Sequence, residues 1–171
     1  LILFTLHPII KNKKIKKKEV DEIFNALKKL AIKNYQIIIT YPNFDPGYDY
    51  IIEKIIILKK IFKNIKVIKH LGRQNYHSLL YYIGKKRQGF CMGNSSSGIK
   101  EAVLFNCPAV NIGDRQKSRL KPTNVVDVQA NQKKIINLIY KKKFLYKKVN
   151  NPYKAKKIFK NLPSIVLKKI Y

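Results

Sequence analysis

The sequence predicts an α/β fold, in which a Rossmann-like parallel sheet is flanked by helices. Apolar runs of strand length alternate with longer amphipathic segments along most of the 171-residue chain. Proline, glycine and asparagine residues mark the turns between them. This length suits one domain with a sizeable core, so residues 1–171 are expected to form a single domain.

Strands are expected where short apolar runs stand between turn signals. These runs are the opening residues, ending within TLHP at 5–8, then 36–40, 66–70, 89–92, Ala109–Ile112 and 124–128. Helices are expected at about 20–30, 48–63, 76–83 and 132–142. The first of them carries a stripe of 3.6-residue period, formed by Val20, Ile23, Phe24, Leu27 and Leu30. A lysine-rich end, 152–171, is expected to be a helical extension that packs on the domain.

The most informative stretch for function is 93–119, GNSSSGIKEAVLFNCPAVNIGDRQKSR. Its small hydroxyl residues and Gly98 open a predicted helix, whose first turn offers unpaired N–H groups and a positive dipole end. Glu101 lies one turn in, where a neutral donor such as a ribose hydroxyl is its natural partner. Arg115, after the next strand, offers a forked cation to phosphates. A nucleotide-diphosphate site is one interpretation, and an N-capped helix followed by a buried strand is the other.

The predicted strands would bring distant residues to one edge of the sheet. Ligands of open α/β sheets bind at the carboxyl ends of the strands. His7 ends the first predicted strand, Asn43 follows the second, and Leu71 follows the third. The loop with three consecutive serines at 95–97, here called the serine loop, follows the fourth strand, and Arg115 follows the fifth. A shared binding edge is therefore expected from the order of the elements alone.

The net charge of +28 permits two interpretations. A basic chain of this length can bind nucleic acid. The lysines are nevertheless spread through nearly every segment, among many isoleucines, asparagines and tyrosines, as AT-rich codon usage produces. We therefore expect no specific nucleic-acid partner, although non-specific, salt-sensitive binding to polyanions remains expected.

Other functional classes receive little support from the sequence. Cys91 and Cys107 stand in apolar surroundings and are expected to be buried thiols. We expect no metal site, because there is no CxxC pair or His/Cys cluster, and no cofactor. The apolar runs are too short to span a bilayer, so we expect a cytoplasmic protein without a membrane partner.

Several motifs in order resemble one family, the UDP-hydrolysing N-acetylglucosamine 2-epimerases. They are TLHP at 5–8, YPNFDPG at 41–47, KHLGRQNYHSLL at 69–80, GNSSSGIKEA at 93–102, PAVNIGDRQ at 108–116 and NVVDV at 124–128. The resemblance implies the C-terminal domain of a two-domain enzyme of the glycosyltransferase-B type. We accordingly expect the chain to be part of a longer protein whose N-terminal domain is missing here, and which can form a homo-oligomer at full length.

The resemblance also implies roles for the matching residues on the sugar and base side. His7 would be catalytic and reach into the cleft near the diphosphate and sugar. Asn43 would face the nucleotide, and the main chain at Leu71 would contact uracil. From the residues alone, His7 could instead satisfy a backbone group at a strand end. Asn43 could equally be a turn residue.

On the phosphate and ribose side, the resemblance implies four UDP-binding residues. Ser95 and Ser96 would hold phosphate through hydroxyls and amides. Glu101 would bind the ribose hydroxyls, and Arg115 would support the nucleotide. From the residues alone, Asp114 could be a turn residue or could orient Arg115. One departure is Ser118, which stands where related sequences usually have glycine and would strain the loop if the position needs a positive φ.

The implied reaction converts UDP-N-acetylglucosamine to N-acetylmannosamine and UDP, for sialic-acid-type sugars. The family's proton-handling carboxylates lie in the other domain, and no acid/base pair stands out in this chain. The isolated chain is therefore expected to bind UDP without turning over substrate. Two alternatives remain open: a glycosyltransferase-B fragment that binds a nucleotide-sugar donor, and a basic nucleic-acid-binding module.

Overall fold

A six-stranded parallel sheet forms the centre of the computed structural model, which describes residues 1–11, 14–141 and 149–153. Each strand pairs in parallel with its neighbours. The strands are β1 (Ile2–Thr5), β4 (Ile37–Thr40), β5 (Ile65–Ile68), β6 (Phe90–Gly93), β7 (Ala109–Ile112) and β8 (Val125–Val128). The predicted fold class is confirmed.

The order of strands in the sheet is β5-β4-β1-β6-β7-β8. The chain builds outward from β1 to β5, then returns to the other side of β1 and builds outward again to β8. This is the Rossmann order, and it places a topological switch point between β1 and β6. The loops after these two strands diverge there, so their carboxyl ends border a crevice.

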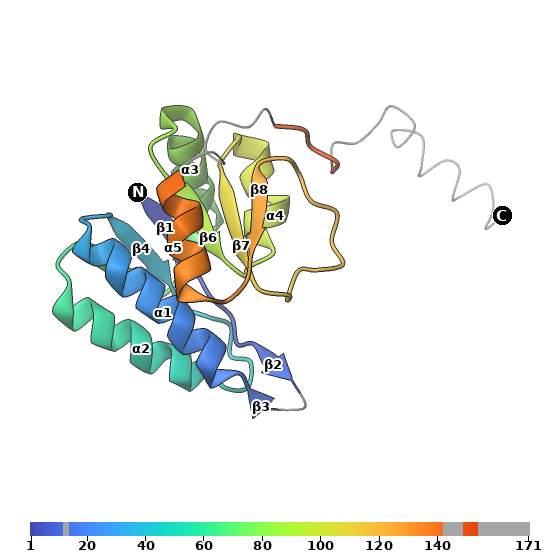
Figure 1. Cartoon of the computed structure of the whole chain (residues 1–171). Coiled ribbons are helices and arrows are strands. Elements are labelled where there is room, and N and C mark those ends of the chain that lie inside the picture. The colour runs from blue at the N-terminus through green and yellow to red at the C-terminus, as the bar shows by residue number, and fades with distance from the viewer. Residues whose placement is uncertain (12–13, 142–148, 154–171) are drawn as a thin grey trace.

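Helices cover both faces of the sheet (Figure 1). The first face packs against α1 (Lys17–Ile32), α2 (Tyr48–Ile61) and α5 (Gln132–Lys141), and α1 contacts both of the others. The second face packs against α3 (Gly72–Lys86), α4 (Ser97–Lys100) and the 3-10 helix η1 (Ala102–Phe105). Because side chains alternate along a strand, β1, β4, β6, β7 and β8 contribute to both layers, whereas the edge strand β5 contributes to the first.

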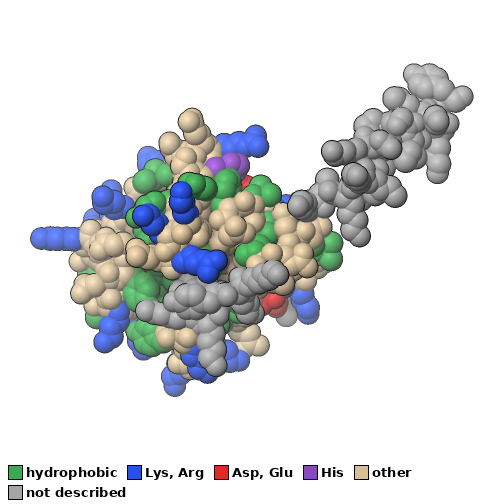
Figure 2. All heavy atoms as spheres, turned by 90° about the horizontal axis from the view of Figure 1, so that it is seen from above, with side chains coloured by type: hydrophobic (Ala, Val, Ile, Leu, Met, Phe, Trp, Pro, Cys, Tyr) green, Lys and Arg blue, Asp and Glu red, His purple; other side chains and the backbone are tan. Residues whose placement is uncertain are grey.

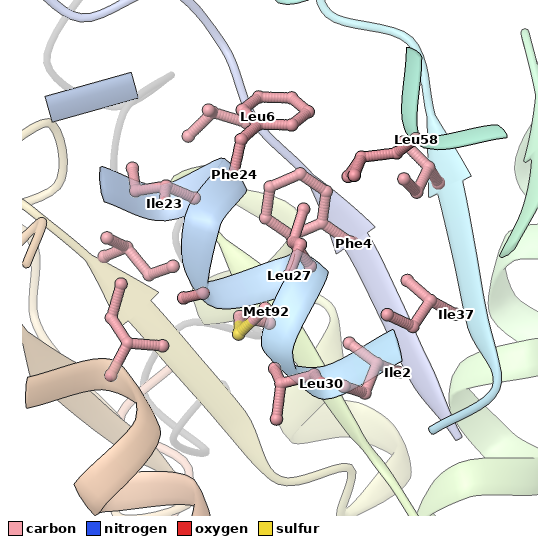
Figure 3. Close-up of a cluster of buried hydrophobic side chains, with 14 of the residues drawn as sticks. Ile2, Phe4, Leu6, Ile23, Phe24, Leu27, Leu30, Ile37, Leu58 and Met92 are labelled. Atoms are coloured by element: carbon pink, nitrogen blue, oxygen red, sulfur yellow. The ribbon is translucent and has the colours of Figure 1, made fainter. Parts of the chain in front are cut away.

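The larger core lies between α1 and the sheet (Figure 3). Every residue of β1 is buried, as expected for a central parallel strand covered on both faces. Phe4 packs edge-on against Phe24 of α1, with 6.1 Å between ring centroids. The predicted stripe along α1 is confirmed, since Val20, Ile23 and their partners are all buried.

Three elements differ from their predicted form. The third helix runs over Gly72–Lys86 rather than 76–83, because its polar first turn carries no apolar periodicity. A short hairpin, β2 (Ile10–Lys11) with β3 (Lys14–Ile15), precedes α1 where only a lysine-rich approach was expected. The helix after the serine loop is four residues long and ends before Glu101. Most of the predicted extension, 154–171, lies outside the described residues.

Gly93 explains how β1 and β6 can lie so close at their carboxyl ends. Its φ is +136°, and a Cβ there would stand 1.8 Å from the Thr5 carbonyl oxygen. Only glycine fits such a position. Ser118, by contrast, is not among the described residues with positive φ, so the serine does not strain its loop in the way considered above.

The structure also tests what the sequence predicted for the cysteines, the surface charge and the membrane. Cys91 and Cys107 are buried, and burial raises the pKa of the Cys91 thiol to about 11. Seen from above, Lys and Arg side chains are spread over the visible surface rather than gathered in one patch (Figure 2). Among the described residues, the helices are all too short or too polar to cross a membrane.

Candidate functional site

An open cleft of about 660 Å³ lies at the carboxyl ends of the strands. It is lined by the loops after β1, β4, β5, β6 and β7, and its floor includes Thr5 and Thr40, whose hydroxyls lie 2.5 Å apart. Every residue for which the sequence predicted a site role lines this cleft: His7, Asn43, Leu71, Ser95, Ser96, Glu101 and Arg115.

Asn94, fully buried at the end of β6, joins the two sides of the switch point. Its side-chain oxygen accepts a hydrogen bond from the His7 backbone N–H at 2.7 Å, and its amide nitrogen donates to the His7 carbonyl at 2.9 Å. Its own carbonyl accepts bonds from Arg115 at 3.2 Å and from Gln116 at 3.0 Å. One residue therefore holds the loops after β1, β6 and β7 in register.

His7 is a buried, neutral imidazole. Its Nδ1 accepts a hydrogen bond from the Asn43 backbone N–H at 3.1 Å, so the ring proton of the neutral form lies on Nε2. Burial and then the Arg115 guanidinium lower the pKa of His7 to about 4, partly opposed by Asp45. At neutral pH His7 can therefore donate one hydrogen bond through Nε2 without carrying charge.

The serine loop is braced from α3. The Ser97 hydroxyl is 2.7 Å from the Tyr76 hydroxyl and 2.9 Å from the Ser95 hydroxyl. Ser96 immediately precedes α4, and its carbonyl accepts bonds from the N–H groups of Ile99 and Lys100, but its hydroxyl makes no capping bond in the described structure. The capping interpretation of the serines is therefore not supported for Ser96, whose half-buried hydroxyl lines the cleft.

Glu101 stands at the junction between α4 and η1, rather than inside a longer helix as predicted. Its carboxylate oxygen Oε2 is 2.6 Å from Nε2 of His77 on α3, and its side chain is 40% exposed. The remaining oxygen can accept further hydrogen bonds from a ligand in the cleft.

Three cations line the cleft: Lys69, Arg73 and Arg115. The bond that orients Arg115 goes to the carbonyl of Asn94, so the suggestion that Asp114 orients it is not supported. Because that bond leaves the guanidinium charge uncompensated by a carboxylate, Arg115 retains its electrostatic attraction for an anion. Glu101 is the carboxylate of the cleft lining.

The loop after β5 presents main-chain groups. The Leu71 carbonyl accepts a bond from the Asn75 side chain at 3.0 Å, and the next residue, Gly72, donates its N–H to Nδ1 of His70 at 2.8 Å. Leu71 starts α3 and lies on the cleft lining together with His70. These local bonds hold the chain in the turn that places half-buried Leu71 on the cleft lining.

Sequence reasoning missed the residues that support the site. Asn94, Tyr76 and His77 each bond a residue that the sequence had singled out, or its loop. No spacing rule indicates such partners, since Tyr76 and His77 are separated from them by a strand and a loop. The only available signal was their place in the shared motifs, KHLGRQNYHSLL and GNSSSGIKEA.

Known protein sequences resemble this chain over most of its length. Residues 1–164 match a family model described as UDP-N-acetylglucosamine 2-epimerase. A hydrolysing GDP/UDP-N,N'-diacetylbacillosamine 2-epimerase of Campylobacter jejuni is 37% identical over 140 residues, covering 77% of this chain and 33% of that protein. A hydrolysing UDP-N,N'-diacetylbacillosamine 2-epimerase of Legionella pneumophila is 34% identical over 140 residues, covering 80% and 34%. The chain thus spans about a third of the length of these curated relatives.

Solved structures share the fold. A UDP-GlcNAc 2-epimerase of Methanocaldococcus jannaschii, crystallised with UDP-GlcNAc and UDP, aligns with a TM-score of 0.69 at 19% identity over 98% of this chain and 45% of that one. A heptosyltransferase of E. coli with ADP aligns with a TM-score of 0.51 at 11% identity, over 82% and 42%. At these identities the likeness concerns the fold alone.

Proposed function

Because this chain belongs to the UDP-N-acetylglucosamine 2-epimerase family, we propose that its cleft binds the UDP moiety of a UDP-activated sugar. The proposal is supported by the way in which the candidate residues come together in space. Residues predicted from five separate segments to contact one nucleotide line a single cleft at the Rossmann switch point.

The diphosphate occupies the end of the cleft near the serine loop and Arg115. The hydroxyls and main-chain amides of Ser95 and Ser96 bind phosphate oxygens, and the guanidinium of Arg115 binds them with charge assistance. His7 and Arg115 both bond Asn94 and line the same cleft. The Nε2–H of His7 donates to the oxygen that leaves with UDP, and being neutral it does so without repulsion from the arginine.

The uridine extends along the loops after β4 and β5. Glu101 accepts hydrogen bonds from the ribose hydroxyls through the carboxylate oxygen that His77 does not occupy. The main chain at Leu71 contacts uracil, and Asn43, whose N–H fixes the His7 ring, faces the nucleotide. This assignment keeps the carboxylate of Glu101 away from the phosphates, because its negative charge would repel them.

The reaction of the full-length protein is elimination followed by hydration. Loss of the hydrogen at C2 and cleavage of the anomeric C–O bond release UDP and leave a glycal. Water then adds across the double bond to give the free 2-epimer. This chain stabilises the departing diphosphate, while the proton-handling carboxylates are supplied by an N-terminal domain. The chain alone, as a single domain, therefore binds UDP without turnover.

Two sugars are candidates for the substrate. UDP-N-acetylglucosamine, giving N-acetylmannosamine for sialic-acid-type sugars, follows from the family match. A UDP-N,N'-diacetylated sugar is favoured by the names of the relatives that are 37% and 34% identical, both of which are hydrolysing enzymes. Both sugars carry a 2-acetamido group, and we propose the same hydrolysing reaction for either. The proposed location is the cytoplasm, and the full-length protein is proposed to form homo-oligomers.

Product analysis tests this function. The full-length protein is incubated with each UDP-sugar, with and without an acceptor alcohol, and products are separated by chromatography. Free 2-epimer and UDP are expected, whereas a glycosylated acceptor would support a glycosyltransferase. Sugar release by the 171-residue chain alone would contradict its inactivity. Polynucleotide footprints on scattered lysines rather than the cleft would support a nucleic-acid module instead.

A further inference from the structure

His77 lies outside the residues assigned to the nucleotide, yet it makes one of the shortest side-chain contacts in the cleft. It belongs to α3, whereas its partner Glu101 follows α4, and Nε2 of the ring is 2.6 Å from Oε2 of the carboxylate. An ionised carboxylate has no proton to donate, so the bond runs from the ring N–H to the carboxylate. Both the charged imidazolium and the neutral ring protonated on Nε2 can make it.

Glu101 needs such a partner if it is to bind a ligand well. It has a long side chain, 40% exposed, on a backbone junction between two short helices. A glutamate side chain that becomes ordered only when ligand arrives loses about 1.5–2 kcal/mol of rotamer entropy at that moment. Fixing one carboxylate oxygen beforehand removes part of this loss.

His77 is itself held in place. Its ring packs against Phe105, with 5.1 Å between centroids and a 50° tilt, and its side chain is 23% exposed. Phe105 belongs to η1, the element that Glu101 starts, and α3 packs on η1. The packing of α3 on η1 therefore fixes both partners, because His77 belongs to α3 and Glu101 immediately precedes η1.

From this geometry we infer that His77 is a positioning residue that makes the site selective for ribose. By occupying Oε2 it directs the other carboxylate oxygen, Oε1, to the ribose hydroxyls of a bound uridine nucleotide. This inference rests on the proposed function, and specifically on the role of Glu101. It assigns to His77 a selective effect: loss of the ring N–H weakens ligands that have ribose hydroxyls and spares those that lack them.

The test compares three ligands and two variants by calorimetric titration of the whole chain. UDP carries both ribose hydroxyls, 2′,3′-dideoxyuridine diphosphate carries neither, and pyrophosphate lacks the nucleoside. His77→Leu removes the donor, whereas His77→Gln can place an amide N–H near the position of Nε2. Unchanged pyrophosphate affinity in both variants reports an intact serine loop and an intact fold.

For the native chain, UDP is expected to bind more tightly than its dideoxy analogue. His77→Leu should weaken UDP binding by about 3- to 10-fold, the effect of one hydrogen bond, and leave the other two ligands unchanged. His77→Gln should restore the preference for UDP.

Three results would overturn the inference, and they are distinguishable. Equal weakening of all three ligands by His77→Leu would indicate a purely structural role for the ring. A preference for UDP that survives His77→Leu would show that Glu101 needs no positioning, and it would leave the proposed function intact. Failure of the native chain to bind UDP at all would remove the proposed function as well.

Discussion

Each of the two edges of the sheet is tied together by one asparagine, and the two asparagines serve different purposes. At the amino edge, the Asn64 side chain donates to the carbonyls of Ala31 and Tyr35, at 2.9 and 2.8 Å, and so ties the turn after α1 to the start of β5. At the carboxyl edge, Asn94 ties three loops together. Both residues satisfy backbone groups that the turns would otherwise leave unpaired.

The difference lies in what each asparagine holds. The Asn64 side chain bonds the backbone carbonyls of Ala31 and Tyr35. Asn94 fixes the backbone of His7, which has a strongly lowered pKa, and the guanidinium of Arg115. Perturbed titratable groups gathered in a cleft are typical of functional sites. The contrast indicates that the bonds of Asn64 at the amino edge serve stability, whereas similar bonds at the carboxyl edge orient the side chains of His7 and Arg115 in the cleft.

The largest effect is expected at Gly93, where the carboxyl edge is most tightly built. Gly93→Ala would place a Cβ 1.8 Å from the Thr5 carbonyl oxygen, at a φ of +136°. The predicted loss of unfolding free energy is more than about 4 kcal/mol, measured by denaturant titration. Gly113→Ala is the control: its φ is +73° but its Cβ would meet nothing, so about 1–2 kcal/mol is expected. Equal losses would contradict the close approach of β1 and β6.

The two asparagines allow the comparison to be made directly. Asn94→Ala should lower the unfolding free energy by about 2–4 kcal/mol, because it leaves a buried N–H and carbonyl of His7 unpaired. Asn64→Ala should lower it by about 1–2 kcal/mol, because the Ala31 carbonyl keeps its bond from the Asn34 N–H. Only Asn94→Ala should also weaken UDP binding. An equal loss of UDP affinity in Asn94→Ala and Asn64→Ala would contradict the functional distinction between the two edges.

The pH dependence of stability tests the state of His7. Its pKa is lowered from 6.5 to about 4 in the folded chain. Between these pH values His7 is protonated in the unfolded chain but neutral in the folded chain, so the free energy of unfolding falls as the pH drops from 6.5 towards 4. The total is up to about 3 kcal/mol.

His7→Asn removes this titration while an oxygen can still accept the bond from the Asn43 N–H. Denaturant melts at several pH values should therefore show a shallower slope between pH 6.5 and 4 for this variant. Asn64→Ala, which destabilises the chain without removing a titrating group, should keep the native slope. An unchanged slope in His7→Asn would mean that His7 is not the buried neutral group described.

The sequence predicted the fold, and the position of the candidate site residues along one cleft, better than it predicted the side chains that support them. The strand Ala109–Ile112 was predicted to its boundaries, and the family resemblance is confirmed, because apolar runs and loop motifs are local. The hairpin at Ile10–Lys11 was missed because two-residue strands leave no periodicity.

The remaining misses arise from tertiary structure. The partnership of Asn94 with His7 spans the switch point, and that of His77 with Glu101 joins two helices. Neither follows from spacing in the sequence. The short helix before Glu101 likewise depends on how η1 packs against α3, which no local propensity encodes. Roles for the site residues are still predictions that binding experiments must test.

The most direct test of the central claim is a calorimetric titration of this chain with UDP and with pyrophosphate at moderate salt. Arg115→Ala removes the cleft arginine, and Arg87→Ala removes an equal charge at the C-terminal end of α3, outside the cleft lining. Saturable binding that prefers UDP, weakened about 1–3 kcal/mol by Arg115→Ala and unaffected by Arg87→Ala, is the predicted result. Binding that ignores the uridine, falls equally in both variants and disappears with salt would contradict a nucleotide site at the carboxyl edge.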